Sequence, residues 1–573
     1  MLRYVFRGGR AALVLLFAAT DAASAQAPTP ARPLTMARRS PVYAPHGVAA
    51  TSQPLATEAA LSVLQHGGNA IDAAVTAAAV LSVVEPMMTG IGGDMFAIVW
   101  SAKEKRLVAL NASGRAGALM TRDELLRRGR THVVGRSAES ITVPGALAGW
   151  QTLLSRYGTM TLAKAIQPAI RYADEGFPVT PVISQDWEGA ADVLQRDEGA
   201  RATFLIPDGG SRRAPHAGDW FRNPDYAQTL RAIAKGGTRA FYDGPLGEKL
   251  VARVHELGGF LTMDDLRKNE PTWVTPISVD FKGYRIWELP PNNQGIASLE
   301  MLKMLEPYDL PALGHNSSAY LHLLIEAKKL AYADLARYVG DADHLTVPPS
   351  YLLSDKFIAE RRSHIDRTHA ATHVDPGPAL TSSETIYLTV ADRAGNMVSF
   401  INSLFDEFGS GVVVPGMGFA LQDRGAGFTL DPGLPNTVAP GKRPFHTLIP
   451  GFVTKPAANP QPDGRGDEPW MSFGLMGGAM QAQGHVQFLL NLLVFGMDVQ
   501  QSMDAARFRH MEGTHVLLEA PITDSVRTAL TALGHLIIPT HGLQFGGSQA
   551  IIKLPRGYMA GSDPRKDGYA AGY

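Results

Sequence analysis

Helical patterns dominate the first two thirds of this chain. Pro54 suits the first turn of a helix that ends at Gly67-Gly68, and Asn69 then opens an alanine-rich helical run from Ala70 to about Val84. The small side chains of that second run suit close burial beneath other elements. The same periodicity predicts further helices at 162–175, 226–235 and 319–338, and a strand at 284–289.

The pattern changes to a period of two near residue 385. Ile386–Ala391 and Met397–Leu404 are rich in β-branched and aromatic residues, and residues 393–396 supply turn chemistry between them. This is the strongest hairpin signal in the chain. A second polar insert, 455–468, is predicted to be a surface loop.

Thr385 stands at the start of the first hairpin strand, after a polar, proline- and glycine-rich connector at 364–384. With the hairpin tip at 394–395, Thr385 faces Leu404, and one bulge would bring it opposite Ser403. A threonine after an exposed connector, with a hydroxyl partner across the strands, is a plausible nucleophile. The spacing alone is weak evidence, because threonines are common at strand starts.

The first residues indicate export. Three arginines among the first ten residues precede an apolar run at 11–19, and small residues follow at 23–25. This pattern is typical of a secretory signal over residues 1–25, which is too short for a membrane span. We therefore expect a periplasmic or secreted protein. The alternative is an upstream mis-start with translation from Met36. Residues 26–42 are expected to form a flexible lead-in.

Composition narrows the function class. The 573 residues carry 53 basic and 54 acidic side chains, a net charge of -1, which gives no electrostatic case for nucleic acid or an anionic membrane. Cysteine is absent, which excludes thiol catalysis, disulfides and thiolate metal sites. The histidines are scattered, so no metal or cofactor is predicted, and His446 and His485 are interpreted as core or loop residues. Ser410 lacks the nucleophile-elbow pattern of serine hydrolases.

Ordered sequence blocks from about residue 45 to the end of the chain resemble the γ-glutamyltranspeptidase family. Thr385 itself, with Asp392 and Gly395-Asn396, matches the start of that family's small subunit. The other matching blocks lie at 82–93, 143–150, 290–295, 331–334, 340–341, 408–411, 433–436, 442–444, 477–478, 547–549 and 562–569.

The resemblance implies an α/β (α+β) fold, a four-layer αββα sandwich of the N-terminal-nucleophile hydrolase class. It further implies an inactive precursor cleaved between Glu384 and Thr385. The large subunit (26–384) and the small subunit (385–573) would then stay together as a heterodimer. The α-amine that cleavage frees on Thr385 would act as the base for its own hydroxyl, so no metal is needed.

The same resemblance assigns roles around Thr385. Gly477 and Gly478 match the glycines whose N–H groups form the oxyanion hole, and Ser403 matches a second hydroxyl residue that bonds the nucleophile. Other positions depart from the transpeptidases. The groups that hold a substrate's α-carboxylate and α-ammonium align here with Ser113, Phe405, Gly427 and the pair His446-Thr447.

These departures resemble a divergent branch that includes oxamate amidohydrolase. We hypothesise that Arg115 and Arg424 bind the anionic group of a small carboxylated amide, with His446 and Thr447 also in the substrate site. The alternative for each arginine is a structural ion pair. The predicted function is a self-processing amide hydrolase or acyltransferase acting on γ-glutamyl-type or other small carboxylated amides. An oxamate-type amidohydrolase without γ-glutamyl activity and a non-catalytic amide-binding relative remain the alternatives.

Overall fold

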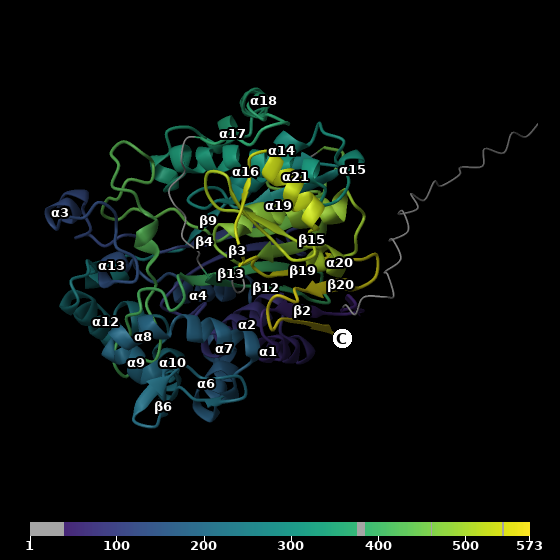
Figure 1. Cartoon of the computed structure of the whole chain (residues 1–573). Helices are drawn as coiled ribbons and strands as arrows, with labels where there is room; N and C mark the ends of the chain where they lie inside the picture. Colours follow the sequence, from purple (N-terminus) through teal and green to yellow (C-terminus); the bar gives the residue numbers. More distant parts are fainter. Residues whose placement is uncertain (1–38, 375–383, 460, 541–543) are drawn as a thin grey trace, which may run out of the picture.

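Two stacked seven-stranded sheets form the centre of the protein (Figure 1). The computed structural model describes residues 39–374, 384–459, 461–540 and 544–573. The first sheet has the order β21-β2-β12-β13-β3-β4-β9, and each neighbouring pair is antiparallel. Its strands are β21 (Tyr569–Gly572), β2 (Val48–Thr51), β12 (Glu384–Ala391), β13 (Met397–Phe405), β3 (Asp94–Ser101), β4 (Arg106–Ala112) and β9 (Thr272–Val274).

The second sheet is also antiparallel throughout, with the order β1-β20-β19-β15-β14-β11-β10. It therefore combines segments from both ends of the chain. Its strands are β1 (Val42–Ala44), β20 (Tyr558–Ser562), β19 (Ser548–Lys553), β15 (Glu468–Leu475), β14 (Pro450–Lys455), β11 (Tyr284–Glu288) and β10 (Ile277–Phe281).

Helices cover the outer face of each sheet. On the first sheet lie α1 (Pro54–Gln65) and α2 (Ala70–Val84), and all of α2 is buried. The alanines of α2 allow its backbone to approach β12 and β13 closely. On the second sheet lie α14 (Gly295–Leu305), α16 (Ser318–Tyr338) and α19 (Met480–Leu493). The predicted αββα sandwich is confirmed.

Alternation along β12 decides which way its side chains point. Ile386 and Leu388 belong to the core beneath α2, whereas Tyr387 lies in the core between the two sheets. Odd-numbered residues of β12 therefore face the interlayer space, as the pleat requires. A β-bulge between Glu384 and Ile386 interrupts this alternation at Thr385.

The remaining elements extend the sandwich at its edges. They are α3 (Arg122–Arg127), α4 (Ala146–Tyr157), α5 (Leu162–Ala165), α6 (Gln167–Glu175), β5 (Phe177–Pro178), α7 (Pro181–Gly189), α8 (Ala191–Arg196), α9 (Glu198–Phe204), β6 (Ile206–Asp208), β7 (Ser211–Arg213), β8 (Trp220–Phe221), α10 (Pro224–Gly236), α11 (Arg239–Tyr242), α12 (Pro245–Glu256), α13 (Met263–Arg267), α15 (Leu310–Leu313), α17 (Pro349–Leu352), α18 (Asp355–Ser363), α20 (Val499–Asp504), β16 (Phe508–His510), β17 (His515–Leu518), α21 (Asp524–Ala532) and β18 (Leu536–Ile537). Short 3-10 turns lie at Ala138–Ser140, Ala342–His344 and Arg424–Gly427.

Most of the predicted elements are confirmed, with three corrections. The helix expected at 162–175 is two helices, α5 and α6, because Pro168 has no N–H to donate and its ring disfavours a continuous helix. Val42, expected in the flexible lead-in, belongs to β1. The insert at 455–468 is a loop whose first and last residues belong to β14 and β15.

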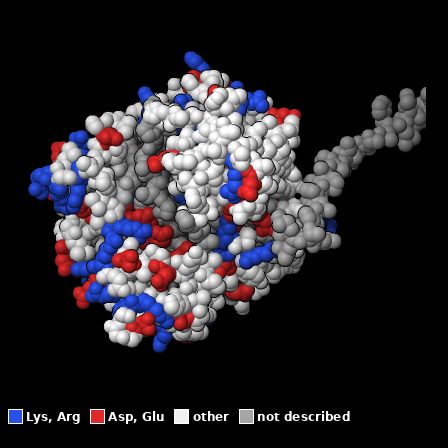
Figure 2. Space-filling model, in the orientation of Figure 1, with Lys and Arg blue, Asp and Glu red and all other residues white. Residues whose placement is uncertain are grey.

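The predicted signal segment lies outside the described residues. Within the described part of the chain, no helix combines the length and apolar character needed to cross a bilayer. Basic and acidic side chains alternate in small groups over the face seen in Figure 2, in keeping with the near-zero net charge.

Candidate active site

Three polar residues form a row across one end of the first sheet. Thr385 is the second residue of β12, Ser403 lies near the end of β13, and Asp94 begins β3 and pairs with Ser403 in the ladder. All three are fully buried. The Oγ1 of Thr385 has no hydrogen-bond partner among the described residues. A buried hydroxyl without a hydrogen-bond partner costs free energy of folding.

The hairpin differs from its predicted register by one residue. The ladder joins Ala391 to Met397 and Ile386 to Asn402, and it shifts between Ile386 and Glu384. The loop between these strands is therefore five residues long. The Asp392 carboxylate stabilises it by accepting hydrogen bonds from the backbone N–H and the side-chain amide of Asn396. The bulge falls at Thr385 itself. Thr385 and Ser403 lie between the pairs Glu384–Phe405 and Ile386–Asn402, so the ladder brings them close together, as expected.

The second sheet packs face to face against β12. Across the interlayer space, Thr389 Oγ1 lies 2.5 Å from Ser472 Oγ, and the ring of Tyr387 packs on Gly474, where an added Cβ would come within 2.3 Å. The two strands thus run in opposite directions, face to face. Met476, which directly precedes Gly477-Gly478, lies in the same interlayer core as Tyr387.

The Gly477-Gly478 loop presents free N–H groups. Both residues have positive φ, 110° and 58°, in the region that favours glycine. Their carbonyl oxygens accept from Met480 and Gln481 at the start of α19. No acceptor among the described residues bonds either N–H. The loop is held from behind by Tyr332, whose hydroxyl donates to the carbonyl oxygen of Ala479 at 2.5 Å.

A buried arginine joins the row. Arg424 donates from Nη2 to Ser403 Oγ at 3.1 Å and from Nη1 to Thr447 Oγ1 at 3.0 Å, and its guanidinium stacks 4.3 Å from the centre of the Phe405 ring. Its Nε has no partner among the described residues. Burial lowers the pKa of Arg424 to about 10, so the guanidinium stays charged at neutral pH.

Asp94 supplies negative charge beside Arg424. One carboxylate oxygen accepts from the backbone of Gly114 and Gly145 and from Gln422, and the other lies 3.2 Å from Nε2 of His446. Burial raises the pKa of Asp94 to about 6, and Arg424 opposes the rise. At neutral pH Asp94 is therefore ionised and compensates the buried arginine.

His446 is neutral in this network. Its Nδ1 accepts from the N–H of Leu448, so its proton is on Nε2 and faces Asp94. Burial, and then Arg424, hold the pKa of His446 well below its usual range. The sequence analysis placed His446 and Thr447 at the site but missed Asp94, although Asp94 directly follows the matched Gly92-Gly93 pair.

The 290–295 block also contributes. Asn292 accepts from Asn111 and donates to Ser113 and to the carbonyl of Pro444, and Gln294 donates to the carbonyls of Thr447 and Gly478. Gln294 therefore fixes the loop that carries Thr447 and the glycine loop together. The sequence analysis matched this block but assigned it no role.

The other candidate residues lie in different environments. Arg115 is partly exposed and pairs with Asp341 at 3.2 Å and with the carbonyl of Gly441 at 2.9 Å, so the structure gives it partners outside the row. Ser410 donates to the carbonyl of Leu421, and His485 bonds the buried Glu288 at 2.7 Å. The last two are structural contacts.

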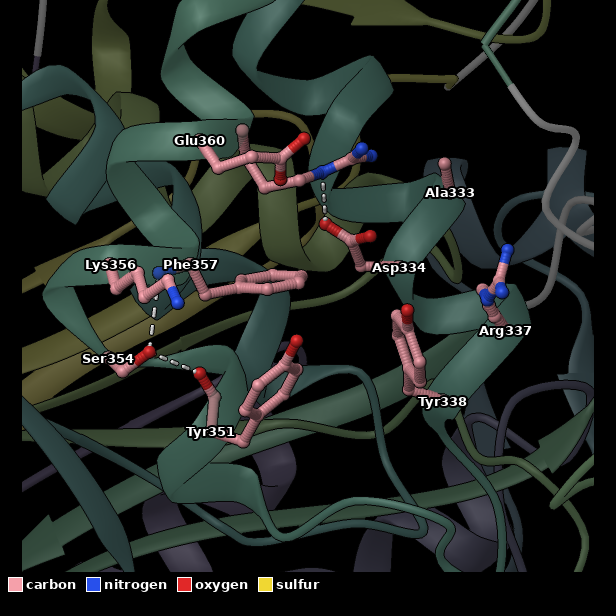
Figure 3. Close-up of a pocket in the computed structure, with 10 residues that line it drawn as sticks. Ala333, Asp334, Arg337, Tyr338, Tyr351, Ser354, Lys356, Phe357 and Glu360 are labelled. Carbon is pink, nitrogen blue, oxygen red and sulfur yellow. Dashed lines mark hydrogen bonds and ion pairs between the residues drawn. The ribbon is translucent and has the colours of Figure 1, made fainter.

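A pocket of about 380 Å³ lies elsewhere, between α16, α17 and α18 (Figure 3). Tyr338, Tyr351 and Phe357 contribute its aromatic walls, and Asp334 in it pairs with Arg361 at 2.9 Å. None of the residues of the row lines this pocket.

An αββα sandwich with a buried threonine near the start of an inner strand is typical of an N-terminal-nucleophile amide hydrolase. The sequence model of the family described as gamma-glutamyltranspeptidase matches residues 56–573, and the chain belongs to that family. The resemblance predicted from the sequence blocks is confirmed. The chain is a self-processing amide hydrolase or acyltransferase of this family.

Relatives and solved structures match along nearly the whole chain. The glutathione hydrolase-like YwrD proenzyme of Bacillus subtilis is 35% identical, covering 90% of this chain and 97% of the relative. The oxamate amidohydrolase proenzyme of Klebsiella pneumoniae is 33% identical, covering 92% and 98%. The crystal structure of cephalosporin acylase from Bacillus halodurans superimposes with a TM-score of 0.86 at 40% identity, covering 95% and 99%.

Proposed function

We propose that the chain cleaves itself between Glu384 and Thr385 and then uses Thr385 to hydrolyse small amides that carry a carboxylate. The observation that carries this proposal is Thr385 Oγ1, which is buried beside Ser403 and has no hydrogen-bond partner in the part of the chain that the structure describes. The large subunit would then comprise residues 26–384 and the small subunit residues 385–573, associated through the shared sheets.

Self-cleavage requires only groups of the chain and water. The Thr385 hydroxyl attacks the Glu384 carbonyl carbon, the peptide C–N bond breaks, and an ester links Glu384 to Thr385 Oγ1. Water hydrolyses the ester, which leaves a carboxylate on Glu384 and an α-amine on Thr385. A model α-amine has a pKa of about 7.7–8.0, so a useful fraction is neutral near pH 7.

Substrate hydrolysis would follow the same route. The amine of Thr385 takes the proton of its own hydroxyl, the oxygen attacks the amide carbonyl, and the amine leaving group departs with a proton. The N–H groups of Gly477 and Gly478 stabilise the negative oxygen of the tetrahedral intermediate, each to the extent of roughly 10²–10³ in rate. Ser403 orients the nucleophile. The resulting acyl-enzyme is hydrolysed by water or transferred to an amine.

Arg424 is proposed to select the substrate. It donates a hydrogen bond to Ser403, and its Nε–H has no acceptor among the residues that the structure describes. His446 and Thr447 complete the proposed substrate site. Arg115 is proposed as a second cation for the same anion, and its pairing with Asp341 is the contact that a substrate carboxylate would replace. The oxamate amidohydrolase relative supports a carboxylated amide in preference to a free amino-acid head group.

Export is part of the proposal. A signal at 1–25 would be removed and the mature protein would be periplasmic or secreted. N-terminal sequencing of the large subunit from the native host tests this, since a chain that starts at Met36 would indicate synthesis without a signal.

Two measurements test the function. A denaturing gel with mass spectrometry should show two fragments meeting at Glu384/Thr385, and an intact active chain would overturn the proposal. A panel of γ-glutamyl anilide, glutathione, oxamate and glutaryl amides then identifies the acyl group. Turnover of oxamate alone selects the oxamate-type alternative. Binding without turnover, unchanged in Thr385→Ala, selects the non-catalytic alternative.

A further inference from the structure

Three buried side chains with metal-binding atoms meet at a second place in the protein. His322 and Glu326 lie four residues apart on one face of α16, and His535 comes from the connection between α21 and β18. One ligand atom from each residue lies within 4.8 Å of the other two. Each of the three residues is 2% exposed. The proposed hydrolysis uses none of them.

The two imidazoles already present ligand nitrogens to one another. Nδ1 of His322 lies 2.8 Å from Nε2 of His535. The other nitrogen of His322, Nε2, donates to the carbonyl oxygen of Asp366 at 2.8 Å, which leaves a lone pair on Nδ1. A backbone carbonyl that fixes the ring in this way is the usual support of a metal-bound histidine.

His535 can adopt the tautomer that metal binding needs. Its Nδ1 is buried and has no partner among the described residues. The ring proton can therefore move from Nε2 to Nδ1 without breaking another hydrogen bond. Both facing nitrogens then offer lone pairs to an ion between them.

We propose that His322, Glu326 and His535 bind one divalent transition-metal ion, of which Zn²⁺ is the preferred example. Two imidazoles and a carboxylate form a ligand set that suits zinc, with bonds of about 2.0–2.2 Å. The two nitrogens need to separate by only a few tenths of an ångström to accept an ion between them. Three protein ligands leave the remaining position to water.

The ion would join the two proposed subunits. His322 and Glu326 precede the proposed cleavage bond, whereas His535 follows it. Ala370 and Ala371, which lie on the chain before that bond, are hydrogen-bonded beside the three ligands. The N–H of Ala371 donates to the Glu326 carboxylate, and the N–H of Ala370 donates to the carbonyl of Leu533. This role rests on the proposed self-cleavage, but ion binding itself does not.

Lys329 limits the affinity. Its ammonium lies 2.7 Å from Glu326 Oε1 and 2.8 Å from the carbonyl oxygen of Ala371, and it already balances the carboxylate charge. A dication must displace this ammonium from Glu326 or bind beside it. We therefore expect micromolar binding, and tighter binding once the lysine charge is removed.

Calorimetric titration of chelator-treated protein with zinc chloride tests the proposal. We expect one equivalent to bind both the wild type and the Thr385→Ala precursor, so the result does not depend on self-cleavage. His535→Ala should weaken binding more than roughly 100-fold. Lys329→Met should tighten it by about tenfold. Zinc should also raise the Tm of the wild type by a few degrees.

The matched control is His364→Ala. Glu360 on α18 and His364, the residue that directly follows this helix, form an exposed glutamate–histidine pair with the same spacing, so this substitution should leave zinc binding unchanged. If the wild type binds no zinc saturably, or if His535→Ala and His322→Ala bind it as the wild type does, the proposal is overturned. Circular dichroism of each variant checks that loss of binding is not loss of folding.

Discussion

Ser403 Oγ accepts a hydrogen bond from Nη2 of Arg424 at 3.1 Å, inside a site from which solvent is excluded. The same oxygen accepts from the N–H of Phe405 at 2.8 Å. A single small hydroxyl therefore satisfies two buried donors and stands beside Thr385. This arrangement connects the nucleophile to the cation that we propose for substrate selection.

Ser403→Ala tests that connection. The substitution leaves two donors without an acceptor, which costs on the order of 1–3 kcal/mol each. We expect self-cleavage and kcat to fall by roughly 10–100-fold, with little change in Ser403→Thr, which keeps the hydroxyl. Single-turnover cleavage of freshly made precursor measures the effect. Ser410→Ala is the control, because Ser410 is also a buried hydroxyl, which donates to the Leu421 carbonyl and accepts from the N–H of Val412. Equal losses in both variants would contradict the assignment.

Thr385 carries the proposed chemistry and allows the sharpest test. Thr385→Ala should stay a single chain and have no measurable turnover, since the attacking oxygen is gone. Thr385→Ser should still split, at a lower rate, because a hydroxyl and a future α-amine are both present. Intact-mass measurement over time follows the splitting. A two-fragment, active Thr385→Ala protein would refute the nucleophile.

The hairpin around Thr385 could be predicted because its pattern is local. Its register could not be predicted. The Asp392 side chain bonds Asn396, and the loop is longer than the tight turn at 394–395 that the sequence pattern predicts. The break between α5 and α6 was not predicted, although Pro168 is a local sequence signal for it. The Asp94–His446 contact joins residues 352 positions apart, and no periodicity reports such a pair. Family blocks pointed to the neighbourhood, but only the fold shows which charges compensate one another.

Arg424→Met tests substrate selection when substrates with and without a free carboxylate are compared. Because the guanidinium is proposed to bind the substrate carboxylate, KM for carboxylated amides should rise by roughly 100-fold, the loss expected for a buried charge pair. The same amides with the carboxylate esterified should be affected much less. Steady-state kinetics on both substrate forms gives the comparison. Arg231→Ala, which removes an exposed pair with Asp174, is the control. An unchanged KM for every accepted amide would exclude the carboxylate role.

Gly477→Ala tests the oxyanion loop. At φ of 110° an alanine is strained, and its Cβ would lie 3.0 Å from Gly546 Cα, so the loop must shift and misplace its N–H groups. We expect kcat to fall by roughly 10²–10³ with KM little changed. Gly496→Ala is the matched control, since Gly496 also has positive φ (64°) but an added Cβ meets nothing within 4 Å. A similar loss in both would indicate general strain and not an oxyanion role.

Glu85 makes the stability of the protein depend on pH. It is fully buried and accepts from Ser52 at 2.9 Å, and burial raises its pKa to about 8, with Lys566 opposing the rise. A carboxyl whose pKa is higher in the folded than in the unfolded protein stabilises the fold at low pH, and this contribution is lost as pH rises from about 4.5 to 8.

The side chain of Glu85→Gln stays neutral over this whole pH range. We expect the Tm of the Thr385→Ala single chain to fall by several degrees between pH 6 and pH 9, and by clearly less in the double variant with Glu85→Gln. Equal falls in calorimetric scans of the two proteins would mean that Glu85 is ionised in the folded state.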